Sequence, residues 1–297
     1  ACLKCFMACG RMTRVKEGPH AGLKIEGPEY ETIYAFGGLC MIDSIEAIIH
    51  LNDICDRLGM DTITAGNLCA FTIEAVRRSR IDYPIRYGDA GGVAALLQDI
   101  ASREGIGAVL ADGLRPAATR WGLEDIAVHV KGMEPAGYDP RPLKGMGLAY
   151  ATADRGACHL RTTFYKPELS GMIDPAQVKG KAELLVDFED RLTLFDALIL
   201  CRFYRDLYPW EALEEIVTAV TGLDADRGAL RRKAAAITTL TRRFNLREGL
   251  TAEDDRLPQR LHRPLEDTDT VVTEAEIATM VQDYYRLRGW DQSGRPV

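Results

Sequence analysis

The stretch Cys2-Leu-Lys-Cys5-Phe-Met-Ala-Cys9 places three thiols on one short turn. Thiolates are soft ligands, and they bind either zinc or an iron–sulfur cluster. A zinc site usually has a second nearby C-x2-C or H-x3-H pair, but His20 stands alone and the next cysteine is Cys40. An iron–sulfur cluster can take its fourth ligand from far along the chain. The spacing therefore favours a metal site over three unrelated thiols, and a cluster over zinc.

The overall composition limits the classes of protein to consider. The chain of 297 residues is 46% hydrophobic and 27% charged, which is typical of a soluble globular protein. Its net charge of −7 argues against a nucleic-acid partner, because binding to phosphates requires a basic surface. No apolar run is long enough to span a membrane, and no signal peptide is visible. Eight irregularly spaced cysteines fit a reducing compartment, so we expect a cytoplasmic protein.

The pattern of apolar residues predicts a mainly α-helical chain. Ser44 is placed to cap a helix whose apolar residues recur at mostly three- or four-residue spacing until Gly59, a typical helix-ending residue. Further helical segments are Thr62 to about Arg80, Gly91–Arg103, a broken helix over Ile106–Trp121, Pro175–Leu200, Trp210–Thr221, Asp224–Asn245 and Thr273–Arg288. Residues 11–41 have the composition of a structured loop, and residues 126–163 have strand and loop character.

The order of these segments predicts the architecture. Strands and helices do not alternate regularly, which argues against a doubly wound sheet. We expect two helical domains, residues 1–125 and 126–297, with few short strands. Because a metal-binding turn rarely begins a polypeptide, we also expect the chain to be the C-terminal part of something longer.

Two segments of the chain resemble each other. They are Asp56-Arg-Leu-Gly-Met-Asp61 and Asp196-Ala-Leu-Ile-Leu-Cys201, each with an aspartate at a helix end and a polar or metal-binding side chain five residues later. Cys201 is therefore the candidate fourth cluster ligand. Taken alone, D-x-x-G is a common helix terminator and Cys201 could be a core thiol.

Together with the opening turn, these segments resemble the aldehyde ferredoxin oxidoreductase family of tungsten- or molybdenum-dependent pterin enzymes. Five further stretches look like that family in the family's order: Glu26–Thr32, Asn52–Asn67, Arg103–Gly113, Lys131–Arg141 and Ala149–Arg161. The match runs in register from residue 2 to about residue 205. Each stretch is weak alone, but all of them in order behind the cysteine turn are specific.

The resemblance implies a set of cofactor ligands. A [4Fe–4S] cluster would be bound by Cys2, Cys5, Cys9 and Cys201. The two wings of a bis-pterin cofactor would be bound through two D-x-x-G-L-C/D motifs, which map to Asp56, Gly59, Asp61, Asp196 and Leu200. An ionised aspartate suits this role because it can accept two N–H donors from the pterin edge. Ile199 replaces the glycine of the second motif, which puts a close approach of the backbone to the pterin in doubt.

The resemblance also implies a substrate site beside the metal. His159 matches the family's histidine, and the family's glutamate corresponds to Glu29 or Glu31, which the sequence does not separate. Histidine titrates near neutral pH and a buried carboxyl can do so, as proton transfer requires. Tyr138 and Arg161 are expected to shape the pocket.

The implied activity is oxidation of a small aldehyde with water to a carboxylic acid, with electrons passing through the cluster to ferredoxin or another electron-transfer protein. The family's N-terminal β-rich domain, which binds the other face of the cofactor, is absent from this sequence, and a homo-oligomer is compatible with the resemblance. Two alternatives stay open. The scaffold could act on a hydroxy acid or an aromatic thioester, or the chain could be a non-catalytic helical protein with a structural zinc.

Overall fold

The computed structural model describes residues 2–297, which form two compact units. The N-terminal unit ends at Gly137, and the C-terminal unit is Tyr138–Val297. The domain boundary expected after residue 125 lies twelve residues before the end of the N-terminal unit. Compact units are not by themselves independently folding domains, so the expected division into two domains stays a prediction. The described residues contain twelve α-helices and only two short strands, which confirms the mainly α-helical class.

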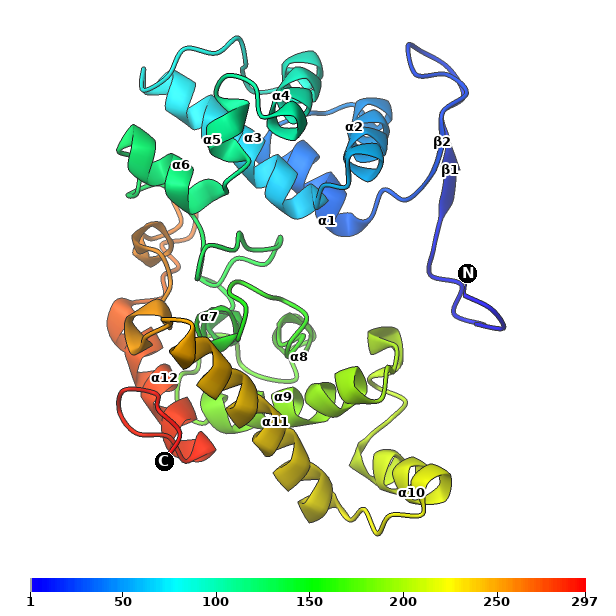
Figure 1. Cartoon of the computed structure of the whole chain (residues 1–297), viewed down its shortest axis with the longest axis vertical. Coiled ribbons are helices and arrows are strands. Elements are labelled where there is room, and N and C mark those ends of the chain that lie inside the picture. The colour runs from blue at the N-terminus through cyan, green and yellow to red at the C-terminus, as the bar shows by residue number, and fades with distance from the viewer. Residues whose placement is uncertain (1) are drawn as a thin grey trace. The chain divides into compact units, whose positions relative to one another are not determined.

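The N-terminal unit begins with the cysteine turn and an antiparallel hairpin of β1 (Met12–Arg14) and β2 (Lys24–Glu26). Its helical elements are α1 (Tyr30–Thr32), the π-helix η1 (Ile33–Leu39), α2 (Ile45–Leu58), α3 (Thr62–Arg77), α4 (Ala90–Ser102), α5 (Gly107–Leu110) and α6 (Leu114–Trp121). Helix α3 packs against η1, α4 and α6 and is the central helix of this unit (Figure 1).

Local signals in the sequence explain where these helices begin and end. The Ser44 side chain accepts a hydrogen bond from the backbone N–H of Ala47, and Gly59 ends α2 with a φ of 70°. The Asp61 side chain caps α3 by accepting from the backbone N–H of Thr64 at 2.8 Å. Capping side chains satisfy backbone donors that the helix itself leaves unpaired, and a left-handed glycine closes the other end. The helices expected over the first 121 residues are thus confirmed within a few residues.

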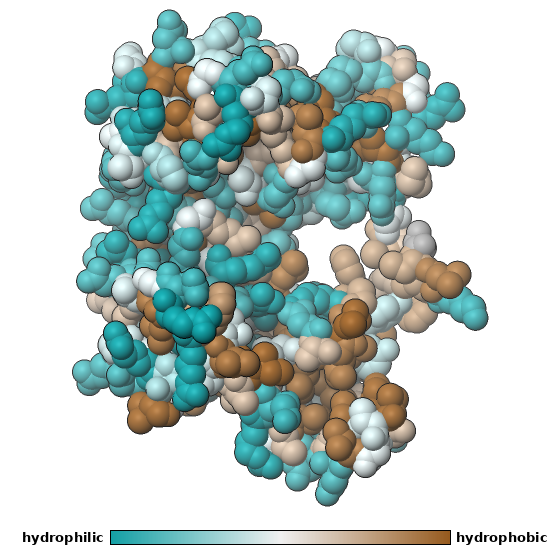
Figure 2. All heavy atoms as spheres, viewed as in Figure 1, coloured by the Kyte–Doolittle hydropathy of each residue, from teal (hydrophilic) through white to brown (hydrophobic). Residues whose placement is uncertain are grey.

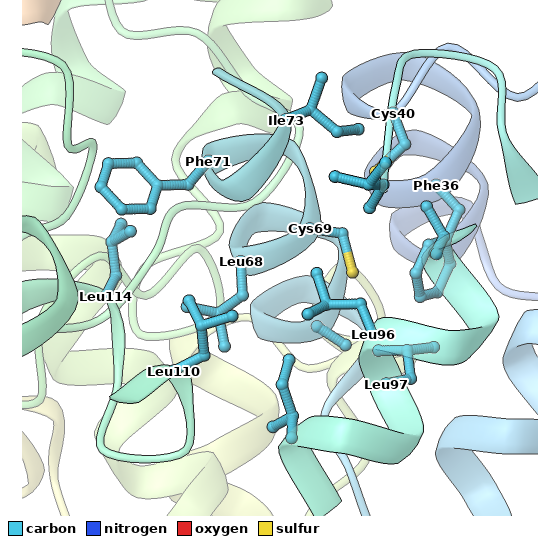
Figure 3. Packing of buried hydrophobic residues seen from close by; sticks show 14 of the residues in the cluster. Phe36, Cys40, Leu68, Cys69, Phe71, Ile73, Leu96, Leu97, Leu110 and Leu114 are labelled. Atoms are coloured by element: carbon cyan, nitrogen blue, oxygen red, sulfur yellow. The ribbon is translucent and has the colours of Figure 1, made fainter. Parts of the chain in front are cut away.

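The core of the N-terminal unit is built on α3. Leu68, Cys69 and Ile73 are buried on this helix and belong to one cluster with Leu96 and Leu97 of α4, toward which Cys69 points (Figure 3). Gly66 lets η1 approach, because a Cβ at that position would lie 2.5 Å from the Cβ of Ala35. This contact ties the segment that carries Glu29 and Glu31 to the start of α3.

The C-terminal unit is a helical assembly around α9. Its elements are α7 (Lys144–Thr152), α8 (Tyr165–Leu169), α9 (Lys181–Ala197), α10 (Trp210–Thr221), α11 (Arg227–Arg247), α12 (Glu274–Arg288) and the 3-10 turns η2 (Arg202–Tyr204), η3 (Ala252–Asp254) and η4 (Gln259–His262). Helix α9 packs against α7, α11 and α12 (Figure 1). In the described part of the chain, no helix is both long and apolar enough to cross a membrane.

The strand character expected over residues 126–163 is wrong for most of that segment. Only an isolated bridge joins Val130 to Met133, and residues 144–152 form α7. Two glycines in α7 lower its helix propensity, so the sequence does not indicate a helix at this place. They are needed for packing: a Cβ on Gly145 would lie 2.3 Å from Cε1 of Phe164, and one on Gly147 would lie 2.9 Å from Cδ1 of Ile277.

Candidate active site

The three cysteines of the opening turn are accessible. The backbone N–H of Cys5 donates to the carbonyl of Cys2 at 3.0 Å, and none of the three cysteines is in a disulfide. Cys2 and Cys9 are exposed and Cys5 is partly exposed. Cysteine thiols on one turn are the donor set that an iron–sulfur cluster uses. Among the described residues, no three histidine, cysteine or acidic side chains are arranged to hold a metal ion.

The predicted fourth ligand, Cys201, lies in the C-terminal unit. It is an exposed free thiol between the end of α9 and η2. Its exposure does not fit a packed core thiol. By contrast, Cys40, Cys55 and Cys69 are fully buried in the N-terminal unit, and burial raises the pKa of Cys40 and of Cys55 to about 12. Those thiols stay protonated and serve packing, whereas Cys201 is available to a ligand.

The first aspartate motif ends α2. Asp56 is exposed, and its Oδ2 accepts a hydrogen bond from the Asn52 side-chain amide at 2.8 Å. The backbone N–H of Gly59 points to the carbonyl of Asp56 at 3.4 Å, and that of Met60 donates to the carbonyl of Cys55 at 2.9 Å. The Asp56 side chain stays exposed at the end of α2, as a pterin contact requires. Asp61, which the resemblance also assigns to the cofactor, has one oxygen committed to capping α3.

The second aspartate motif ends α9 in the same way. The backbone N–H of Ile199 donates to the carbonyl of Asp196 at 3.2 Å, and that of Leu200 donates to the carbonyl of Phe195 at 2.8 Å. Ile199 has a φ of 58°, close to the 70° of Gly59. The replacement of glycine by isoleucine therefore leaves the backbone geometry of the motif intact. Leu200 is partly buried against the core of the C-terminal unit.

Asp196 is held by two arginines. Its Oδ2 accepts from Arg161 at 2.8 Å and from Arg202 at 2.7 Å, and Arg161 also donates to Asp154 at 2.8 Å. These charge-assisted bonds orient the carboxylate. A cavity of about 300 Å³ adjoins this cluster and is lined in part by Asp154, Arg161, Asp196 and Asn245. Arg161 lines this cavity, and its expected place in the substrate pocket stays a prediction.

Glu29 and Glu31 have different environments. Glu29 is exposed and lies 3.6 Å from the guanidinium of Arg11. Glu31 is half-buried, and its Oε2 accepts from the backbone N–H of Gly137 at 2.9 Å. Burial raises the pKa of Glu31, the hydrogen bond from Gly137 opposes that rise, and the Asp61 carboxylate adds to it. Of the two, Glu31 has the environment of a proton-transfer group.

His159 lies beside two tyrosine rings within the C-terminal unit. Its ring centroid is 5.8 Å from that of Tyr138 and 6.3 Å from that of Tyr165. The two tyrosines stack on each other with centroids 3.9 Å apart. This pair restricts the orientations open to the imidazole. Tyr138 was expected near the pocket, but Tyr165 was not, because only the fold brings α8 beside Tyr138.

Glu134 is a buried carboxyl group of the N-terminal unit that the sequence did not single out as a site residue. Glu134 is almost fully buried, and its Oε2 accepts from the Thr64 hydroxyl at 2.9 Å. Burial raises its pKa, which its hydrogen bonds partly offset, and the charge of Asp61 contributes to the rise. Its position in the stretch Lys131-Gly-Met-Glu134 was the available signal. The geometry makes Glu134 a support for the first turn of α3, where Asp61 lies.

Comparison with known proteins gives a consistent result along the whole chain. A family model described as "Aldehyde ferredoxin oxidoreductase, domains 2 & 3" matches residues 1–297. The tungsten-containing aldehyde ferredoxin oxidoreductase of Pyrococcus furiosus is 34% identical over 99% of this chain and 50% of its own length. The protein of the same name from Thermococcus kodakarensis is 32% identical with the same coverage. The chain therefore spans about half the length of the curated relatives it matches.

More distant proteins share the fold. A WOR-like subunit of an aliphatic sulfonate oxidoreductase from Pyrococcus furiosus is 26% identical over 98% of this chain and 48% of its own length. The active-site complex BamBC of benzoyl coenzyme A reductase, solved with 1,5-dienoyl-CoA, has a TM-score of 0.79 at 18% identity. That likeness covers 100% of this chain and 51% of the solved chain, and at this identity it shows the fold alone.

Proposed function

Because the chain belongs to the aldehyde ferredoxin oxidoreductase family, we propose that it is the C-terminal part of an enzyme that oxidises an aldehyde and water to a carboxylic acid. The observation that carries the proposal is the match of the whole chain to the family's domains 2 and 3. Asp56 and Asp196 support it, because both are exposed and occupy equivalent positions at the ends of α2 and α9, as contacts with two wings of one cofactor would require.

The proposal assigns the ligands as follows. Cys2, Cys5, Cys9 and Cys201 would hold a [4Fe–4S] cluster, and Asp56, Gly59, Asp61, Asp196 and Leu200 would contact the pterins. When bound, the metal–pterin centre supplies the oxygen-transfer and redox chemistry. The names of the relatives favour tungsten over molybdenum. The protein's own contribution is to bind and orient these groups and to move protons.

Aldehyde oxidation with water releases two protons and two electrons. Glu31 would take a proton from the water-derived oxygen, because its raised pKa brings the carboxylate closer to the operating pH. His159 would accept or relay the second proton, with its ring oriented by Tyr138 and Tyr165. The electrons would leave through the cluster to ferredoxin or another electron-transfer protein.

The proposal requires further partners. A β-rich domain that binds the other face of the pterins would complete the site, either in the same polypeptide or in a second chain. We further propose that the enzyme works in the cytoplasm on a small aldehyde and that it can form a homo-oligomer. The same scaffold with another substrate, such as a hydroxy acid or an aromatic thioester, is the alternative that substrate screening tests.

Metal analysis of anaerobically purified protein tests the proposal first. Iron, acid-labile sulfide, zinc, tungsten and molybdenum are measured together on the unmodified chain and on Cys201→Ser. We expect about four irons per chain in the unmodified protein and a clear loss of iron in the variant. One zinc per chain without iron would overturn the cluster assignment and favour a structural metal site.

A further inference from the structure

Ile199 has an unusual backbone conformation for its residue type. Its φ of 58° lies in the left-handed region, which β-branched residues avoid because the side chain meets the backbone. The equivalent position in the first motif is Gly59, which adopts a φ of 70° without a side chain. Both positions make the same helix-ending hydrogen bonds. Glycine would therefore serve the backbone at position 199 better than isoleucine does.

Packing does not compensate for this strain within the described residues. The Ile199 side chain is 93% exposed, so it gains almost nothing from burial. A strained residue usually persists where the surroundings or a function require it. Since burial within the chain does not require Ile199, a contact with another group is the remaining physical reason for its side chain.

The surroundings of Ile199 indicate the nature of that contact. Cys201 is exposed two residues further along, and the neighbouring Leu198, Phe203 and Leu207 are also exposed. Figure 2 shows apolar side chains gathered over this part of the C-terminal unit, around the end of α9 and α10. These exposed apolar residues, Leu198, Ile199, Phe203 and Leu207, flank the thiol on both sides along the chain and are called the apolar collar. Such a collar is suited to a group that must be kept from water.

We propose that the Ile199 side chain covers the iron–sulfur cluster that Cys201 helps to bind, and that this contact is what retains a β-branched residue at a glycine position. The inference rests on the proposed function, because it requires the cluster. An apolar shell limits the access of water to a metal site and thereby sets its reduction potential. Water stabilises the more negatively charged reduced cluster, so removal of the cover should make the potential more positive.

Two substitutions separate the cover from the strain. Ile199→Gly removes both, whereas Ile199→Ala removes the cover and keeps a Cβ in the left-handed conformation. Leu240→Ala is the control, since it shortens an exposed leucine on α11, away from the cysteines in the sequence. The readouts are the rate of iron release to a chelator, the midpoint potential of the cluster and the Tm of the metal-free chain.

We expect both Ile199 variants to release iron at least several-fold faster and to have a more positive potential, with the control unchanged. Ile199→Gly should also raise the Tm of the metal-free chain by about 2–4 °C, and Ile199→Ala should raise it less. Unchanged release and potential in both variants, with full iron content, would overturn the proposed cover. Absence of iron from the unmodified protein would instead overturn the proposed function.

Discussion

The ion pair between Lys181 and Glu168 is a fully buried interaction of the C-terminal unit, and its loss should be strongly destabilising. The two side chains are 1% and 0% exposed, and Lys181 Nζ lies 2.7 Å from Glu168 Oε1. Glu168 also accepts from the backbone N–H groups of Gly145 at 2.8 Å and Met146 at 3.1 Å, at the start of α7. Removal of one partner from a buried ion pair costs about 3–5 kcal/mol, because the other charge is left uncompensated. We therefore expect Lys181→Met to destabilise this unit by that amount.

The assay is urea unfolding followed by tryptophan fluorescence. Trp210 and Trp290 lie in the C-terminal unit, and a Trp121→Phe background removes the tryptophan of the N-terminal unit. With a urea dependence of about 1–3 kcal/mol per molar, a loss of about 3–5 kcal/mol should lower the midpoint by roughly 1–5 M. The double variant Lys181→Met/Glu168→Gln is the control, and it should recover part of the loss because no buried charge is left alone.

The loss should also depend on pH in a defined direction. Burial already raises the pKa of Glu168 above its ordinary value of 4.5, and loss of Lys181 removes the interactions that lower it. A carboxyl with a raised pKa in the folded state contributes stability at low pH that is lost as pH rises through the folded pKa. The variant should therefore be closer to the unmodified protein at about pH 5 than at about pH 8. A loss below about 1 kcal/mol, or the opposite pH trend, would refute the reasoning.

Three further predictions concern the proposed chemistry in the complete enzyme. Glu31→Gln should lower kcat by about 10²–10⁴ while its exposed neighbour variant Glu29→Gln changes it little, which steady-state kinetics would check; equal losses would remove the distinction between them. Turnover should fall as pH drops through the raised pKa of Glu31, and Glu31→Gln should lose this acid limb, as a pH–rate profile would reveal. His159→Ala should lower turnover with unchanged iron and tungsten content, and unaffected turnover would exclude it from proton transfer.

The helices that the sequence predicted well are those whose signals are local. The Ser44 cap and Gly59 lie next to the residues they control, so the bounds of α2 follow from neighbouring residues alone. Helix α7 could not be predicted from its own residues. Its Gly145 leaves room for the ring of Phe164, which lies nineteen residues later in the chain, so no local sequence pattern links the two. A helix that contains glycines for packing is concealed until its neighbours are known.

The candidate site shows the same division. The spacing of Cys2, Cys5 and Cys9 is a local pattern, and by itself it indicates a metal ligand set. The choice between Glu29 and Glu31 depends on burial and on a backbone donor from Gly137, more than a hundred residues later. The pairing of Asp196 with Arg161, thirty-five residues earlier, and the stacking of Tyr165 on Tyr138 likewise arise only from tertiary packing.

The two aspartate motifs clarify what their glycine is for. At Gly59 the residue takes a left-handed conformation at the end of α2, and at position 199 isoleucine takes the same conformation at the end of α9. The backbone requirement is therefore a left-handed residue three positions after the aspartate, which ends the helix close to the carboxylate. Glycine meets this requirement without strain, and isoleucine meets it with strain while adding an apolar side chain beside Cys201. The position therefore has two separate properties. One is the backbone shape of the turn, which glycine and isoleucine both give, and the other is the exposed surface, which only isoleucine makes apolar.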